Sequence, residues 1–576
     1  MSQYLRQLGN VLQCLVALAI VAGLAALWPG LGRGAAHRVL RWIGRVSRSS
    51  VLSALVAGSA SLVVSLAIVA IAGPPHAQVH DEFAYLLMAD TFAHGRVTNP
   101  TPDCWISFET MHELMTPTYA SKFGVAQGLS LALGQVVFHA PWVGVTIVTA
   151  LAVAALTWCV RAFVPPRWAL FGGLLAAVHP QILIWGHQYW GGNIGMLGGA
   201  LVLGSLARIV APRRPGRQPL PIAGLATTLA LGLAVLANSR PYETAVWGLI
   251  IAVALAIWFR QRAPRPRIAT IARLVLPCLV VLAPVAGAMA YYNWRVTGHP
   301  MQLPYTLHSR QYMAVPLFFW QKPPPPRTYN NEQLREQHEG FERGYFEEQR
   351  TLRGWFRWAG YKIYYFSELH LLRNLVITIG LIGLLAKLAD SNRQVIPVAI
   401  RLALFAAGAF ILAYAIIPWF ESHYAGQATP ILFILALTGA RHVRASGPRG
   451  RALLRFATVS CALVLAFVVL RERRNNSGGF ATERYQIEQR LVHRPPGRHL
   501  VFVRYGPKHD PGLEWDYNQA DIEASPVIWA RDLGDEKNLA VIARYGAGRQ
   551  VWLLEVQDDG HPADLQPLLS DRNAPR

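Results

Sequence analysis

The sequence predicts an all-α polytopic membrane protein with about twelve spans and a small α/β domain at its C-terminal end. Of its 576 residues, 53% are hydrophobic and only 15% are charged, whereas a soluble chain would carry about a quarter charged residues. Apolar runs near the roughly 20 residues that cross a bilayer recur along most of the chain. The segment 471–576 lacks such runs and has the composition of a soluble domain.

The apolar runs divide the chain into three parts. The expected spans are 11–29, 51–73, 139–161, 168–186, 193–210, 219–237, 243–260, 270–292, 369–388, 396–418, 425–441 and 452–470. Residues 1–50 form an extra N-terminal span with a basic loop, 51–470 the main transmembrane module, and 471–576 the soluble domain. Two long loops, 74–138 and 293–368, interrupt the module.

Positive charge is concentrated in every second loop between spans. These loops contain Arg33, Arg38, Arg41, Arg45, Arg48, Arg161, Arg167, Arg213, Arg214, Arg217, Arg260, Arg262, Arg265, Arg267, Lys387, Arg393, Arg441, Arg444, Arg449 and Arg451. Basic loops stay in the cytoplasm, so we expect both long loops and the tail on the outer face, the periplasmic side of a bacterial inner membrane. The net charge of +22 thus follows from topology, and no nucleic-acid binding is expected.

The long loops carry their own helical patterns. Apolar residues at helical spacing in 82–95 predict an amphipathic helix on the membrane surface. In the second long loop, the proline run 322–327 predicts a stiff turn. A charged helix is expected over 331–350, and an interfacial helix rich in aromatic and basic residues over 352–366.

The tail has a different pattern. Residues 498–505 and 539–556 are rich in β-branched and aromatic residues and predict strands. A helix over 482–492 is expected to join them to the last span. Together they indicate a small α/β domain.

An acidic pair follows the second span directly. Asp81 and Glu82 come after His80 in the sequence "HDEFAYLL". Two carboxylates at the mouth of a helical bundle are suited to general-base catalysis or to metal binding. They are equally typical of a helix N-terminus, where acids favour the positive end of the dipole.

A second polar group lies further along the same loop. In "FETMHE", a helix would place Glu109, His112 and Glu113 on one face, where they could bind a divalent metal ion with Asp81 or Glu82. No cofactor is certain, because ordinary surface charges explain this group as well. Lys122 is a candidate phosphate contact or a solvated lysine.

The short outer loops add polar and aromatic residues. Arg240 is notable because an arginine at membrane depth is costly unless it is paired or functional, and Glu243 is its nearest structural partner in the sequence. The candidate substrate- and phosphate-binding residues are Arg240, Lys122, His187, Tyr189, Tyr242, Glu243, His423 and Tyr424. All come from outer helix ends or loops and can converge on one polar cavity.

This combination resembles the GT-C glycosyltransferases. The resemblance covers about 51–470 and is closest to the branch of the protein O-mannosyltransferases and the lipid A aminoarabinose transferase. It lies in "HDE" directly after a span, in the helix that follows, and in "RPYE", "ASKFG" and "HYAGQATP", which are similar to family-39-like members.

The resemblance implies a GT-C-like bundle and a specific activity. A sugar would move, with inversion, from a polyprenyl-phosphate-linked donor to a hydroxyl or amine of a lipid, glycan or protein acceptor at the periplasmic face. The acid that activates the acceptor would be Asp81 or Glu82, as a general base or a metal-linked acid. Some relatives use a divalent metal and others do not. The tail has no counterpart in the resemblance.

Two other functions compete with this one. About twelve helices also suit a transporter or a lipid flippase for envelope glycolipids, although no internal repeat is visible. An inactive relative that scaffolds envelope assembly is the third hypothesis. All three place the chain among membrane lipids.

Overall fold

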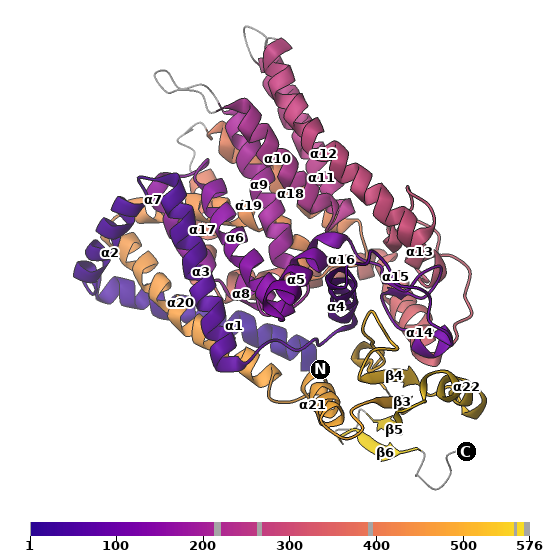
Figure 1. The fold of residues 1–576 in the computed structure, drawn as a ribbon. Helices are drawn as coiled ribbons and strands as arrows, with labels where there is room; N and C mark the ends of the chain where they lie inside the picture. Colours follow the sequence, from indigo (N-terminus) through magenta and orange to yellow (C-terminus); the bar gives the residue numbers. More distant parts are fainter. Residues whose placement is uncertain are drawn as a thin grey trace.

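The computed structural model describes residues 2–211, 221–261, 268–389, 396–507, 509–557 and 562–568. It is a helical bundle with two long loops and a small α/β domain at one end (Figure 1). The chain is a multi-pass membrane protein, as predicted. Some predicted basic residues lie outside the described residues, namely Arg213, Arg214, Arg217, Arg262, Arg265, Arg267 and Arg393.

The predicted spans are largely helical. The bundle consists of α1 (Ser2–Leu27), α3 (Ser50–Ala72), α6 (Pro141–Val160), α7 (Pro166–Ala177), α8 (Pro180–Trp185), α9 (Gly192–Val210), α10 (Ile222–Ala237), α11 (Pro241–Gln261), α12 (Ile268–Thr297), α17 (Leu375–Ala389), α18 (Val398–Ala415), α19 (Thr429–Ala445) and α20 (Pro448–Asn475). A further helix, α2 (Arg33–Val46), follows α1.

Fewer helices than predicted could cross a membrane alone. Among the described residues, eight helices are long and apolar enough, or nine if a pair bent by 111° at α17 counts as one span. The predicted span 168–186 is broken into α7 and α8, since Pro180 cannot continue a helix. Helices α10 and α19 are shorter, and many of their residues are buried in the bundle.

Small residues let the central helices approach closely. A Cβ atom added to Gly439 in α19 would lie 1.8 Å from the carbonyl oxygen of Gly380 in α17, so the two backbones are in contact at this point. Such crossings are typical of helix packing in membranes.

The first long loop contains α4 (His80–Ala93), the 3₁₀ turn η1 (Trp105–Phe108), the strands β1 (Glu113–Leu114) and β2 (Ala120–Ser121), and α5 (Val125–Phe138). Helix α4 confirms the predicted helix, but its expected place on the membrane surface is wrong. Its residues Ala84, Leu87 and Ala89 are at most 2% exposed, because both α5 and the C-terminal domain pack against it.

The second long loop is mostly helical. It contains α13 (Pro304–Gln311), α14 (Glu332–Arg335), the π-helical turn η2 (Glu336–Glu342), α15 (Arg343–Gln349), α16 (Leu352–Ser367) and the π-helical turn η3 (Glu368–Leu372). The predicted helices at 331–350 and 352–366 are confirmed, and the proline run 322–327 has neither helix nor strand.

The C-terminal domain contains α21 (Phe480–Val492), β3 (His499–Tyr505), η5 (Pro511–Leu513), β4 (Val527–Arg531), α22 (Asp535–Tyr545), β5 (Gln550–Val556) and β6 (Asp564–Pro567). The strand order is β4-β3-β5-β6. Strand β3 is parallel to β4 and β5, and β6 is antiparallel to β5.

Two predictions for this domain are confirmed and one is half wrong. The strand at 498–505 and the helix at 482–492 are present. The predicted strand 539–556 begins instead as α22, whose buried residues Asn538, Val541 and Tyr545 follow helical spacing. Only its second half is a strand, after a turn in which Gly548 has a φ of 69°.

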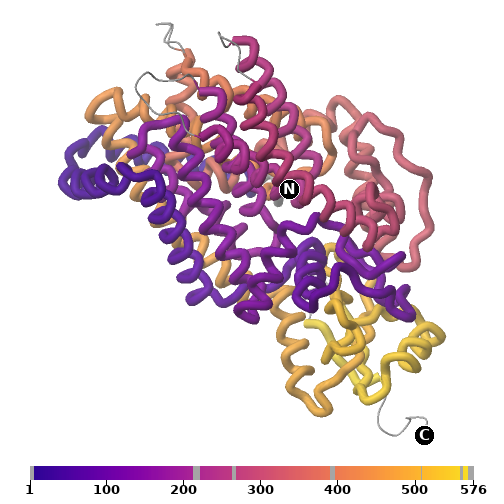
Figure 2. The backbone as a smooth tube through the Cα atoms, turned by 45° about the horizontal axis from the view of Figure 1, so that its top comes forward, coloured from indigo at the N-terminus to yellow at the C-terminus, as the bar shows by residue number. Residues whose placement is uncertain are grey.

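The domain is joined to the first long loop by a common hydrophobic core. Leu87, Phe108 and Tyr119 of the loop pack in one cluster with Leu500 and Phe502 of β3. Figures 1 and 2 show the domain in yellow at one end of the molecule, beside this loop. It therefore packs as a fixed part of that end of the protein.

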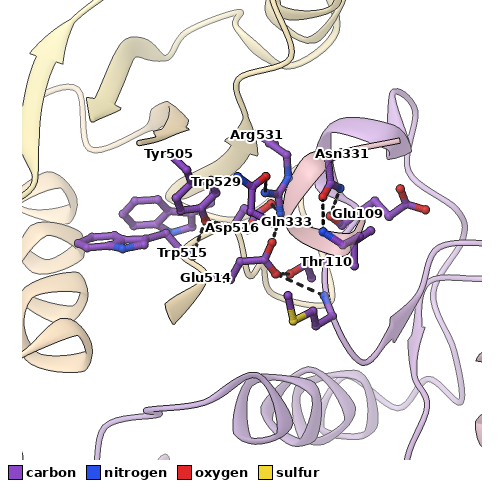
Figure 3. A network of polar contacts seen from close by, with 12 residues as sticks. Glu109, Thr110, Asn331, Gln333, Tyr505, Glu514, Trp515, Asp516, Trp529 and Arg531 are labelled. Carbon is purple, nitrogen blue, oxygen red and sulfur yellow. Dashed lines mark hydrogen bonds and ion pairs between the residues drawn. The ribbon is translucent and has the colours of Figure 1, made fainter. Parts of the chain in front are cut away.

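A buried ionic network reinforces this junction (Figure 3). Arg531 in β4 forms ion pairs with Glu514 and with Asp516, the latter at 2.7 Å. Glu514 also accepts a hydrogen bond from the Thr110 hydroxyl in the first long loop, at 2.5 Å. The Arg531 guanidinium donates to Gln333 in the second long loop, at 2.7 Å. Both loops are thus tied to the C-terminal domain.

Candidate active site

The two adjacent acids at the start of α4 have opposite surroundings. Glu82 is 1% exposed, and its carboxylate accepts hydrogen bonds from the backbone N–H groups of Gln78 at 2.8 Å and Tyr189 at 2.7 Å. Burial raises the pKa of Glu82 to about 7. Its contacts fix the start of α4 against the loop between α8 and α9. Asp81 is on another side of the helix and lines a cavity.

The cavity lies where the bundle, the two long loops and the short loop after α10 meet. Its volume is about 670 Å³, within the range usual for small-molecule sites. Its polar and charged lining residues are His80, Asp81, Tyr85, His112, Lys122, Asn238, Ser239, Arg240, Tyr242, Glu243, Tyr292, Asn293, Tyr305, Thr306, Gln337, Glu342, Glu421 and Tyr424. Apolar side chains such as Met289 and Phe341 complete the walls.

Two histidines flank the Asp81 carboxylate. His80 Nδ1 lies 3.3 Å and His112 Nε2 3.4 Å from Asp81 Oδ2. The two rings meet edge to face, with centroids 4.4 Å apart. Burial opposes ionisation of Asp81, but the contacts with His112 and then with His80 outweigh it and hold its pKa well below the usual range. The carboxylate is therefore charged at neutral pH.

The β1–β2 hairpin positions two of these groups. His112 precedes β1 and has a φ of 67°, a left-handed conformation that is uncommon for a residue with a side chain. Its carbonyl oxygen accepts a hydrogen bond from the backbone N–H of Lys122, at 3.1 Å. The hairpin thereby places a histidine and a lysine side by side at the cavity wall.

Both cations of the cavity wall contact aromatic rings. The Lys122 ammonium lies 5.3 Å from the center of the Phe123 ring and 5.4 Å from that of Tyr305. The Arg240 guanidinium lies 3.6 Å above the Tyr424 ring. Within the described residues neither has a carboxylate within 4.0 Å, so the pair of Arg240 with Glu243 considered from the sequence is not formed.

Burial makes the lysine unusual. It lowers the pKa of Lys122 to about 8, against the opposing influence of Asp81. Lys122 therefore remains mostly charged at neutral pH in a site with little water. Two cations in one cavity, neither in a direct ion pair with a described carboxylate, form a site suited to an anion.

Other predicted residues have different positions. Tyr242, Glu243 and Tyr424 line the cavity, whereas His187, Tyr189 and His423 do not. Tyr189 supports the wall from behind, since its hydroxyl donates to the Pro75 carbonyl oxygen at 3.0 Å. His423 packs against Trp190, with ring centroids 4.6 Å apart.

The predicted metal set of Glu109, His112 and Glu113 does not converge. The segment is a turn that leads into β1 rather than a helix, so the shared face on which the prediction depended does not exist. Glu109 accepts hydrogen bonds from Tyr312 and Asn330, each at 2.9 Å. Glu113 is 1% exposed, and its pKa is raised well above the usual value by burial and by nearby Asp516.

A different set has the geometry for a divalent metal ion. Within the described residues, ligand atoms of His80, Asp81 and His112 all lie within 4.8 Å of one another. The Nδ1 atoms of both histidines are buried without a hydrogen-bond partner. Two imidazoles and a carboxylate suit zinc and related ions, so these residues fit a metal.

Two functional candidates were not predicted from the sequence: His80 as a metal ligand and Glu342 as an acid of the cavity wall. His80 was visible beside the acidic pair, but only its distance to Asp81 and His112 gives it a role. Glu342 lies in the second long loop and lines the cavity, where its carboxylate contacts His338 Nδ1 at 2.8 Å. No local pattern connects residue 342 with residue 81.

Comparison with known proteins supports the fold. Neither a protein-family model nor a curated protein sequence matches the chain. Among solved structures, the chain is similar to ArnT from Cupriavidus metallidurans bound to undecaprenyl phosphate, at 13% identity and a TM-score of 0.50, covering 87% of this chain and 92% of that one.

Two other structures are more distant. The oligosaccharyltransferase of Archaeoglobus fulgidus in complex with zinc and sulfate has 13% identity and a TM-score of 0.46, covering 86% of this chain and 67% of that one. The arabinofuranosyltransferase AftD from mycobacteria has 14% identity and a TM-score of 0.39, covering 89% and 35%. The bundle, its long loops and the match over nearly the full length of ArnT show that this chain has the fold of the GT-C glycosyltransferases.

Proposed function

We propose that this protein transfers a sugar from a polyprenyl-phosphate-linked donor to a hydroxyl or amine of a lipid, glycan or protein acceptor. One observation carries the proposal: an ionised carboxylate, Asp81, faces the same cavity as Lys122 and Arg240, two cations that form no direct ion pair within the described residues. A base for the acceptor and an anion site for the leaving group are what this reaction needs. The fold, shared with ArnT bound to undecaprenyl phosphate, supports the same reading.

The residues divide the chemistry between them. Asp81 accepts the proton of the acceptor O–H or N–H as that atom attacks the anomeric carbon. The bond between this carbon and the phosphate oxygen breaks, and its electron pair stays on the departing phosphate. Lys122 and Arg240 stabilise the negative charge that grows there. Attack opposite the leaving group inverts the configuration at the anomeric carbon.

Three residues would hold a divalent metal ion, if one is bound: His80, Asp81 and His112. Such an ion supplies electrophilic stabilisation of negative charge on oxygen. Asp81 then acts as a metal-linked acid. The role of Glu82 is to position α4, because its carboxylate is fully engaged with backbone N–H groups.

The proposal also assigns the reaction to one side of the membrane. We place both long loops and the C-terminal domain on the periplasmic side of a bacterial inner membrane, because the short loops at the opposite side carry the arginines. Cysteine substitution at Asp103, which is exposed in the first long loop with 67% side-chain accessibility, tests this. A membrane-impermeant maleimide should label it in intact spheroplasts, and labelling only after lysis would contradict the orientation.

Analysis of cell-envelope products tests the activity. In a deletion strain, mass spectrometry of envelope glycolipids, glycans and glycoproteins should show the loss of one sugar-bearing product. The wild-type gene should restore it, and Asp81→Asn should not, at equal protein level in the membrane. A product that is unchanged by deletion, or fully restored by Asp81→Asn, would contradict the proposal. Accumulation of an unchanged lipid substrate on the cytoplasmic side would favour a flippase instead.

A further inference from the structure

The structure contains a second cavity, which shares no lining residue with the candidate active site. Its volume is about 240 Å³, and it lies between α1, the end of η3 with the start of α17, and α20. It is lined by Asn10, Gln13, Cys14, Ala17, Leu372, Arg373, Leu375, Ser460, Leu463, Val464 and Phe467. Most of these side chains are apolar, and Arg373 is the cation among them.

Arg373 lies at a bend in the membrane part of the chain. It follows η3 directly, where the path turns by 111° into α17. Its guanidinium donates to the Asn10 carboxamide oxygen at 3.2 Å and lies 4.2 Å from the center of the Phe467 ring. Its Nε atom is buried without a hydrogen-bond partner. No carboxylate in the described part of the chain comes within 4.0 Å of it.

An arginine in this position requires an explanation. Charged side chains at membrane depth are costly unless they are paired, and they mark functional sites by default. Glu368, in the π-helical turn before Arg373, accepts a hydrogen bond from the Asn10 side-chain N–H instead, at 2.9 Å. Within the described residues, Arg373 therefore has no carboxylate as an ion-pair partner.

The cavity opens toward lipid. Helix α1 is attached to the outside of the bundle, since Leu12, Leu15 and Val16 are each at least 50% exposed. On the α20 side, Leu463 is 76% exposed. A molecule that reaches Arg373 from the bilayer would pass between these apolar side chains, which can contact an acyl or prenyl chain.

We propose that this cavity binds the phosphate group of an anionic membrane lipid, with Arg373 as the charged contact and Asn10 and Gln13 as further hydrogen-bonding groups. Basic pockets between transmembrane helices bind phosphate-bearing head groups at the cytoplasmic side of membranes, and an arginine fork matches phosphate geometry on either side. The hydrocarbon chain of the lipid lies along α1 and α20. The bound lipid thereby fills the gap between the N-terminal helix and the bundle.

Two lipid classes carry this phosphate, and the experiment distinguishes them. The full-length protein, delipidated in detergent, is titrated in native mass spectrometry with dioleoylphosphatidylglycerol, a polyprenyl phosphate, and dioleoylphosphatidylcholine as a lipid without net charge. Because the polyprenyl phosphate is also expected in the candidate active site, its titration is repeated with the Arg240→Gln protein. Binding that persists there and depends on Arg373 identifies the carrier lipid as ligand.

Loss of the guanidinium should weaken binding of the anionic lipid about tenfold or more, since hydrogen bonds to charged groups are strong. The change is Arg373→Gln, and the matched control is Arg353→Gln, which removes an exposed arginine of α16 and should leave binding unchanged. Leu463→Trp tests the site without changing its charge, because it fills the cavity from the lipid side and should also weaken binding.

Three results would overturn the proposal. Wild-type affinity of Arg373→Gln for both anionic lipids would show that the arginine is not the contact. Equal affinity of the wild type for phosphatidylcholine would show that charge is not recognised. If Arg373→Gln does not fold, unchanged binding by Leu463→Trp would have the same consequence.

Discussion

Buried cations form ion pairs at the junction of the C-terminal domain, but they contact aromatic rings in the candidate active site. At the junction, Arg531 is paired with Glu514 and Asp516, and all three side chains are at most 2% exposed. In the cavity, Lys122 is 6% exposed and Arg240 is partly exposed. Both cations contact aromatic rings instead of acids. The first arrangement is complete within the chain, and the second is not.

This difference separates assembly from ligand binding. A buried ion pair need not stabilise a protein, but removal of one partner leaves a charge without compensation. Charges that lack a partner in the folded chain are retained at a cost, which a bound ligand of opposite charge offsets. Variants at the two sites should therefore affect different quantities: stability at the junction and activity in the cavity.

Asp81→Asn should have the largest effect on activity. Loss of the base should reduce sugar transfer about 10²–10⁴-fold, the usual contribution of a positioned general base. The amount of folded protein in the membrane should not change. The matched control, Asp103→Asn, neutralises an exposed acid of the same loop and should retain full transfer. Equal activity of both variants would mean that Asp81 has no chemical role.

Arg531→Met should have the largest effect on stability. It leaves Glu514 and Asp516 close together without a cation, and breaking a buried pair costs about 3–5 kcal/mol. Thermal unfolding of the purified protein, followed by cysteine accessibility, measures the loss. Arg504→Gln is the control, because its ion pairs are exposed on the arginine side and such pairs contribute about 0–1 kcal/mol. Similar unfolding temperatures for both variants would contradict the contrast between junction and cavity.

Lys122→Met and Arg240→Gln should reverse this pattern. Each removes one stabilising contact to the leaving phosphate, and a loss of about 10²–10³-fold in rate is expected. The loss of stability should be smaller than for Arg531→Met, because neither cation has a carboxylate within 4.0 Å among the described residues. The transfer rate and the unfolding temperature, measured on the same preparations, distinguish a catalytic role from a structural one. A variant that unfolds early but turns over normally would assign these cations to structure.

The smallest effect concerns pH and Glu421. Burial raises the pKa of this cavity residue from 4.5 to about 7, although the Tyr365 hydroxyl donates to it at 2.9 Å. Between pH 4.5 and pH 7, the Glu421 carboxyl is therefore protonated in the folded state and ionised in the unfolded state. Stability from this group is complete below pH 4.5 and is lost as the pH rises to 7.

The slope of that loss is at most about 1.4 kcal/mol per pH unit, since one proton is involved. Glu421→Gln should flatten the curve of unfolding free energy against pH in this interval. The exposed acid Glu332 provides the control, as Glu332→Gln should leave the slope as it is. A curve with the wild-type slope in Glu421→Gln would assign the dependence to another acid.

Much of the fold could be predicted from the sequence because hydrophobic length and period are local properties. The runs around α3, α6 and α9 identify spans without knowledge of their neighbours. The same rule overcounted spans, since an apolar run does not reveal whether Pro180 breaks it into α7 and α8. For 539–556, the β-branched composition outweighed the helical spacing of Val541 and Tyr545.

The candidate site was harder to predict, because it depends on contacts distant in the sequence. The acidic pair lies beside the cavity, which only Asp81 lines, because adjacent residues on a helix point in different directions. Only the hydrogen bonds of Glu82 to Gln78 and Tyr189 show which acid is engaged elsewhere. The helical geometry that would give Glu109, His112 and Glu113 a common face is absent, because a turn precedes β1 at this point. Lys122 and Arg240 could be singled out from their positions, but only the structure shows that they line one cavity.

The shared core between the first long loop and the C-terminal domain has a consequence for biosynthesis. Leu87 and Phe108 emerge from the ribosome long before their partners Leu500 and Phe502 of β3. Until β3 has been synthesised, the first long loop, which carries Asp81, lacks part of the apolar surface against which it packs. A chain that stops before β3 should therefore insert its early helices and yet leave this loop without its partner.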